Sequence, residues 1–206
     1  FAPAAPDRHD WLIGLMEGVE DIPGSALSEG MSWNWESFPE YLDALEEMPR
    51  AVDVATHVPH GAVRAYVMGD RGAANEDPTE SDIARMANIV EEGLRAGALG
   101  FSTSRTVLHK SIDGELVPGT TATPEELIGI GRGMARVGHG VFEMASDLIP
   151  RAPAEPQVPH GVHLHALLRQ HHPHRHPGAD TRLVSSWRVV IYVCMHSWRA
   201  TNAWLP

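Results

Sequence analysis

The spacing of apolar side chains predicts a helix between Thr79 and Gly97. Thr79 and Asp82 form a capping signal, because a threonine hydroxyl can accept a hydrogen bond from a free backbone N–H of the first turn. Gly97 stands where a glycine commonly ends a helix. One apolar face is formed by positions that recur every three or four residues, namely Ile83, Met86, Ala87, Val90 and Leu94.

The same pattern returns between Thr123 and Gly138 and predicts a second helix. Thr123 precedes Pro124, and proline suits the first helical position because its missing N–H would be unpaired there anyway. The apolar positions of this second helix are Leu127, Ile130, Met134 and Val137.

Three short apolar runs, residues 52–58, 98–102 and 139–145, have the composition of buried strands. They alternate with the two helices, and this order predicts parallel strands joined by right-handed crossovers. The fold class is therefore α/β. A doubly wound sheet and a segment of a (β/α)₈ barrel both agree with the pattern.

The first fifty residues are less regular. Residues 10–20 fit a short helix, and a helical patch at 42–45 follows an aromatic cluster. This cluster either packs against the sheet or forms the wall of a substrate pocket. Its members are Trp33, Trp35, Phe38 and Tyr41.

The chain changes character near Pro150. Residues 1–150 contain 25 acidic side chains, whereas residues 151–206 contain two acids, six arginines and eight of the 13 histidines. We expect a folded region over 1–150 and an irregular tail over 151–206, and a frameshift near Pro150 is our hypothesis for the change. The tail segment 170–177 would bind nickel or zinc weakly as an open patch of histidines.

Composition narrows the classes of function. The net charge of −11 argues against nucleic-acid binding, which usually needs a basic face. The late apolar run at 189–195 is far shorter than the roughly 20 residues of a membrane span, and the single cysteine, Cys194, excludes an internal disulfide. We expect a soluble, cytoplasmic protein. Its 206 residues are fewer than the about 250 of a complete barrel.

Parallel α/β units place functional groups after the carboxyl ends of strands, which selects residues 57–60, 102–110 and 143–147. Histidine is a natural zinc ligand, but His57 and His60 would point to opposite sides of one strand.

The hydroxyls of Ser102, Thr103 and Ser104 suit either a bound anion or the loop backbone. Glu143, among apolar neighbours, must be paired, metal-bound or protonated. Asp147 is better placed for a metal or substrate.

Residues 1–150 resemble the N-acyl-D-amino-acid deacylase (D-aminoacylase) branch of the amidohydrolase superfamily. The resemblance rests on segments in family-like order: Phe1-Ala-Pro3, Pro59-His-Gly-Ala-Val-Arg64 with Val67-Met-Gly69, Gly97-Ala-Leu-Gly-Phe-Ser-Thr103, and Pro118-Gly119. It implies part of a metal-dependent (β/α)₈ barrel and the hydrolysis of a carbon–nitrogen amide bond in a small N-acyl amino acid. Zinc, or another divalent metal, would activate the attacking water.

The resemblance also suggests site residues. His60 and Arg64 would be active-site neighbours, while residues 102–105 (Ser102, Thr103, Ser104 and Arg105) and the loop to Gly119 would lie on the substrate side. Independently of the resemblance, their places at strand ends make His57, Glu143 and Asp147 the candidate metal ligands. In the family a His-x-His pair and a cysteine precede this region, and Ala145 stands near the position of a ligand histidine.

Because few family ligands are present, we expect this chain to be an inactive fragment, with no metal bound by the fragment itself. The alternative is a non-enzymatic metal-binding or interaction protein that works through its histidine-rich tail. A doubly wound binding domain is disfavoured, since the chain has neither GxGxxG nor GxxxxGK.

Overall fold

The structure is a computed structural model, and it describes residues 1–146. The candidate ligand Asp147 and the predicted tail at 151–206 therefore lie outside the described residues. So do Pro150 and the histidine patch at 170–177.

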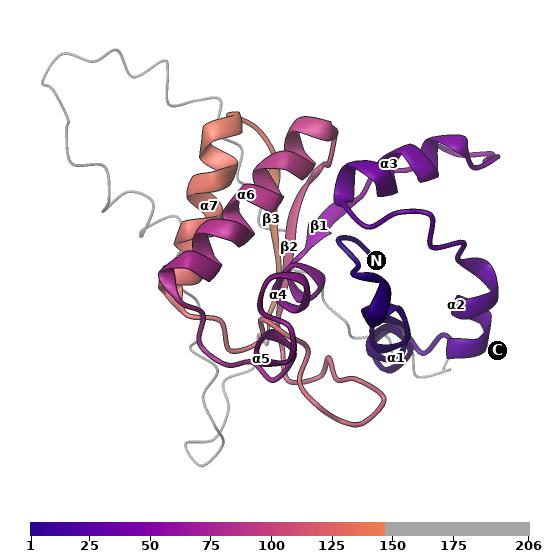
Figure 1. Cartoon of the computed structure of the whole chain (residues 1–206), viewed down its shortest axis with the longest axis horizontal. Coiled ribbons are helices and arrows are strands. Elements are labelled where there is room, and N and C mark those ends of the chain that lie inside the picture. The colour runs from indigo at the N-terminus through magenta and orange to yellow at the C-terminus, as the bar shows by residue number, and fades with distance from the viewer. Residues whose placement is uncertain (147–206) are drawn as a thin grey trace, which may run out of the picture.

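A three-stranded parallel sheet forms the centre of the described part (Figure 1). Strands β1 (His57–Pro59), β2 (Gly100–Arg105) and β3 (Val141–Ser146) lie in the order β1-β2-β3. Val58 is in register with Phe101, and Phe101 with Phe142. The α/β class with parallel strands is confirmed, while residues 1–146 do not form a complete barrel.

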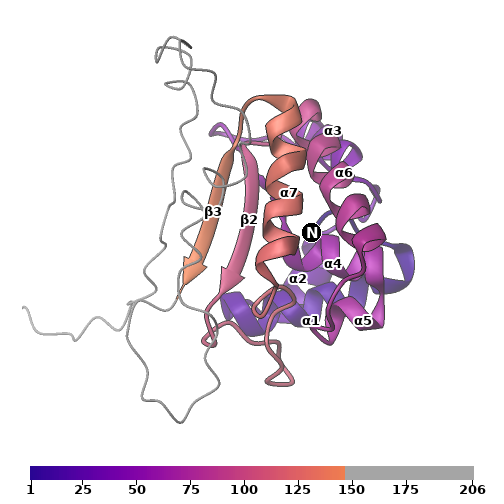
Figure 2. The ribbon, with the colours of Figure 1, turned by 90° about the vertical axis from the view of Figure 1, so that its left-hand side faces the viewer.

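Helices α6 (Glu80–Ala96) and α7 (Pro124–Val137) pack against each other on one face of the sheet (Figure 2). The core lies between these helices and the sheet, because the apolar positions of both helices point there. Its fully buried members include Val58, Met86, Val90, Leu94, Phe101, Leu127 and Ile130.

Both predicted helices begin and end at the predicted residues. The Thr79 side chain accepts from the backbone N–H of Asp82, and the Asp82 carboxylate accepts from Thr79 in return. The Thr123 side chain accepts from the backbone N–H of Glu126 at the start of α7, and Gly138 ends this helix in the left-handed conformation. These boundaries follow from the sequence because caps depend on residues three or four apart.

The prediction of a strand over 52–58 was wrong in its bounds. β1 begins only at His57, and the side chains of Val52 and Val54 are 70% and 55% exposed. A strand needs a partner, and β2 runs beside the chain only from Thr56 onward. His60 does not end the strand either, because it begins helix α4 (His60–Met68). The first turn of that helix follows Pro59, which has extended backbone angles.

The other helices come from the first half of the chain. They are the 3₁₀ turn η1 (Pro6–Arg8), α1 (His9–Glu20), α2 (Gly24–Gly30), α3 (Phe38–Glu47) and α5 (Asp70–Ala73). Figure 2 places α1 and α5 near the end of the sheet to which the strand arrows point. The aromatic cluster packs into the core: Trp35 and Phe38 are buried, and Tyr41 contacts both rings.

Candidate functional site

Strand β2 divides the predicted substrate-side residues between two faces of the sheet. Thr103 and Arg105 are buried on the face that the helices cover, while Ser102 and Ser104 are half-buried on the opposite face. This split follows from the alternation of side chains along a strand. The structure therefore does not bring these four residues to one surface.

His60 and Glu126 form the centre of a buried polar cluster on the helix-covered side. His60 is the first residue of α4 and Glu126 lies in the first turn of α7; their side chains are 1% and 0% exposed. The His60 Nε2 lies 3.0 Å from a Glu126 carboxylate oxygen, and Nδ1 lies 2.8 Å from the Thr103 hydroxyl.

The hydrogen-bond partners of His60 determine which of its ring nitrogens carries the hydrogen. Burial lowers the pKa of His60, so the ring is neutral and carries a single N–H. A carboxylate only accepts hydrogen bonds, so Nε2 holds the hydrogen and donates it to Glu126. Nδ1 then accepts from the hydroxyl of Thr103.

Arg64 supplies the positive charge that balances Glu126. It lies one helical turn after His60, is 1% exposed, and its Nη1 reaches a Glu126 oxygen at 2.6 Å. Its Nη2 donates to the Glu76 carbonyl. Burial alone would raise the pKa of Glu126, but His60 and Arg64 outweigh it and lower that pKa. The pair therefore stays ionised.

Arg105 is a second guanidinium on this side. It donates to the Ala122 carbonyl, and burial lowers its pKa while Glu126 opposes that effect. Among the described residues, Arg64 Nε and Arg105 Nη2 are buried without a hydrogen-bond partner. The cluster as a whole joins α4, β2 and α7. The side chains of this cluster hold the sheet and the helices together inside the fold. They belong to His60, Arg64, Thr103 and Arg105.

His57 and Glu143 meet on the opposite, helix-free face. The His57 Nδ1 lies 3.1 Å from a Glu143 carboxylate oxygen, and both side chains are partly exposed. Gly100 is the register partner of His57 and has no side chain, so the imidazole can reach across β2. Glu143 was expected to be paired, metal-bound or protonated, and this geometry is that of a paired carboxylate.

Two of the three candidate metal ligands are thus adjacent. However, residues 1–146 contain no group of three histidine, cysteine or acidic side chains arranged to hold a metal ion. His57 Nε2 has no partner in this part of the chain, but one nitrogen does not make a zinc site, which needs three or four ligands. The described residues do not by themselves fit the metal that the resemblance implies.

A second polar pair lies at the carboxyl end of β2. The Ser104 hydroxyl is 2.9 Å from Nδ1 of His109, a half-buried residue of the loop that follows the strand. This loop was predicted to lie on the substrate side, but the prediction did not single out His109. The signal available in the sequence was a histidine five residues after Ser104, near the carboxyl end of β2.

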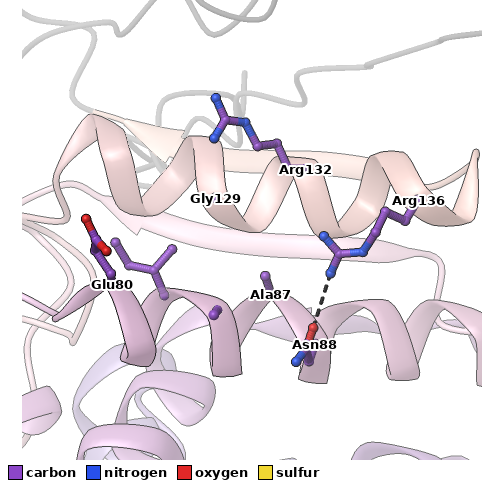
Figure 3. A pocket seen from close by; sticks show the side chains of 8 residues that line it. Glu80, Ala87, Asn88, Gly129, Arg132 and Arg136 are labelled. Carbon is purple, nitrogen blue, oxygen red and sulfur yellow. Dashed lines mark hydrogen bonds between the residues drawn. The ribbon is translucent and has the colours of Figure 1, made fainter. Parts of the chain in front are cut away.

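A shallow groove runs along the outside of the two packed helices (Figure 3). Arg136 of α7 reaches Asn88 of α6 at 3.2 Å and also pairs with Glu91. The groove is lined by Glu80, Ile83, Ala84, Ala87, Asn88, Gly129, Arg132 and Arg136. It lies on the far side of the helices from the sheet, so it is separate from both polar pairs.

No helix among residues 1–146 has the length and apolar character needed to cross a lipid bilayer.

Comparison with known proteins gives a consistent family. The model of a family described as "Amidohydrolase family" matches residues 3–169. A D-aminoacylase of Alcaligenes xylosoxydans xylosoxydans is 37% identical over 131 residues, which are 64% of this chain and 24% of that protein. An N-acyl-D-aspartate deacylase of the same organism is 32% identical over 120 residues, covering 55% of this chain and 22% of that protein.

A solved structure of a D-aminoacylase, described as having a binuclear metal centre, aligns with a TM-score of 0.43 at 32% identity. The alignment covers 54% of this chain and 21% of that one. The chain thus spans about a quarter of the length of the curated relatives it matches.

Proposed function

This chain belongs to the amidohydrolase family, and we propose on that basis that it forms part of an enzyme that hydrolyses the amide bond of N-acyl-D-amino acids. The observation that carries the proposal is the 37% identity to a D-aminoacylase over 131 residues. A second relative is named as a deacylase of N-acyl-D-aspartate. Both names describe removal of an acyl group from the nitrogen of a D-amino acid.

The arrangement of the described residues agrees with a segment of such an enzyme. Two helices cover one face of a parallel sheet, and polar side chains line the other face near the carboxyl ends of the strands. In (β/α)₈ enzymes the helix-free face is the barrel interior, and substrates bind at the carboxyl ends. Under this proposal Ser102, Ser104 and the loop to Gly119 lie on the substrate side.

His60 and Arg64 have a supporting part in this proposal. Both are sealed against Glu126, so they hold the strands in position and do not touch substrate directly. The described residues contain no group of three potential metal ligands. The proposal therefore attributes no step of the reaction to a metal ion held by this part of the chain.

The test begins with the DNA on both sides of the region that encodes this chain. The longest continuous reading frame, alternative frames across Pro150 included, is expressed, and amino acid release from N-acetyl-D-leucine and N-acetyl-L-leucine is measured. We expect hydrolysis of the D substrate, with much less of the L substrate.

The 206-residue chain alone serves as the control, and we expect it to be inactive. Lack of release from both enantiomers by the longer product would contradict the proposal. Activity of the 206-residue chain alone would instead contradict our expectation that it is an inactive fragment.

A further inference from the structure

The loop after β2 is a fixed hairpin. Lys110 and Leu116 form an antiparallel bridge, and the turn between them is closed by hydrogen bonds from Ser111 N to the Glu115 carbonyl at 2.8 Å and from Gly114 N to the Ser111 carbonyl at 2.9 Å. A hairpin of this kind holds its first residues in one conformation, because both of its sides are paired.

Two other elements hold the hairpin in place. The Ile112 N–H donates to the Gly14 carbonyl of α1 at 3.3 Å. The side chain of Asn75 donates to the Leu116 carbonyl at 3.1 Å and accepts from the Gly119 N–H at 2.8 Å. The loop is therefore tied to α1 and to the segment that follows α5, at the carboxyl end of the sheet.

This anchoring sets the position of His109, one residue before the bridge. Its Nδ1 meets the hydroxyl of Ser104 at 2.9 Å, and Leu108 N donates to the Thr106 hydroxyl at 3.1 Å in the turn between them. Ser104 belongs to the helix-free face, since its neighbours Thr103 and Arg105 are buried against the helices. The pair thus stands at the carboxyl edge of that face.

We propose that Ser104 and His109 bind the carboxylate of the substrate, with the Ser104 hydroxyl as the donor and His109 as the residue that orients it. This inference rests on the proposed function, because it takes an N-acyl amino acid as the substrate class. This role requires the His109 tautomer that carries its hydrogen on Nδ1, so that the Ser104 oxygen accepts that hydrogen and the hydroxyl hydrogen points at a substrate oxygen.

The choice of the carboxylate follows from where the pair lies. An N-acyl amino acid offers two kinds of oxygen, the amide carbonyl that reacts and the carboxylate that does not. A hydroxyl held by an imidazole is suited to the part of the substrate that only needs to be positioned, and hydrogen bonds to a charged acceptor are the stronger kind.

The test uses the whole 206-residue chain and two probes, N-acetyl-D-leucine and its amide, N-acetyl-D-leucinamide. They differ only at the carboxyl group. Binding is followed by NMR through the imidazole ¹⁵N signals, with the His109 signals assigned from the His109→Gln variant. We expect the acid to shift the His109 signals and the amide to bind about ten-fold more weakly.

Variants separate binding from folding. Ser104→Ala should weaken binding of the acid about ten-fold, while Ser104→Thr, which keeps the hydroxyl, should restore it. The exposed His139→Gln is the matched control, and it should leave binding unchanged. Circular dichroism melting shows whether each variant is folded.

Three results would overturn the inference: the acid shifts other signals but not those of His109, the acid and the amide bind equally well, or neither compound binds. The hydrolysis assay separates this from the proposed function. Hydrolysis of the D substrate with no response at His109 rejects the carboxylate site alone. A response at His109 without any hydrolysis by the longer product supports the site and rejects the reaction.

Discussion

Glu126 is the residue on which the buried polar cluster depends, because it accepts hydrogen bonds from both His60 and Arg64. Glu126→Gln removes the negative charge and leaves the buried guanidinium of Arg64 without compensation. Removing one partner of a buried ion pair lowers the stability by about 3–5 kcal/mol. We therefore expect the free energy of unfolding in urea to fall by about that amount.

Glu125 provides the control for this variant, because it is the preceding residue of α7 but is exposed. Glu125→Gln should change the stability by less than about 0.5 kcal/mol. Equal effects of the two variants would mean that the cluster does not stabilise the fold.

His60 makes the stability depend on pH. Burial lowers the pKa of His60 from its ordinary value of 6.5, so below about pH 6.5 the unfolded chain takes up a proton at this residue that the folded chain does not. Stability should therefore fall as the pH drops from 6.5 toward the lowered folded pKa, by at most about 1.4 kcal/mol per pH unit from this residue. Urea unfolding at pH 7.5, 6.5 and 5.5 measures the slope.

The variant His60→Gln should show a smaller slope over that range, because glutamine does not titrate. The exposed His139→Gln should keep the slope of the parent chain. Unchanged slopes in both variants would contradict a neutral, buried His60. The pKa of Glu126 is also lowered from its ordinary 4.5, so its contribution is lost at still lower pH.

At the scale of elements, the contact between α6 and α7 depends on glycine. A Cβ at Gly133 would lie 2.5 Å from the carbonyl oxygen of Ala87, which is backbone and cannot move aside. Gly133→Ala should therefore force the helices apart and cost about 1–3 kcal/mol. Thermal or urea unfolding checks this.

Gly131 lies in the same helix and gives the opposite expectation. A Cβ there would meet nothing within 4 Å, so Gly131→Ala should stabilise the helix by up to about 1 kcal/mol. If both alanine variants raised the stability, the close approach of the two helices would not limit the size of the side chain at position 133.

At the scale of the whole molecule, the two hypotheses for function use different parts of the chain. The alternative assigns metal binding to the histidine-rich segment, with His171, His172, His174 and His176 as its ligands. Replacing these four residues with alanine in the full chain should weaken the zinc binding seen by calorimetry, because the described residues contain no group of three potential ligands.

We expect that binding to be weak, as for an open patch of histidines. His139→Ala is the control and should leave it unchanged. Tight zinc binding that persists in the four-residue variant would contradict this expectation, since it would require a metal site elsewhere in the chain.

The sequence by itself determined the elements whose signals are local. The caps at Thr79 and Thr123, the ends at Gly97 and Gly138 and the apolar period between them predicted α6 and α7 to within a residue, because a helix is specified by side chains three and four positions apart. The alternation of strands and helices likewise predicted the parallel sheet.

Only the tertiary structure decided how distant residues pair. His60 and Glu126 are 66 positions apart, and neither residue signals the other in the sequence. The late start of β1 at His57 depends on where β2 runs beside it, and the separation of Thr103 from Ser104 depends on which face the helices cover. Strand register and helix packing set these relations, and both are formed by segments that meet only when the chain folds.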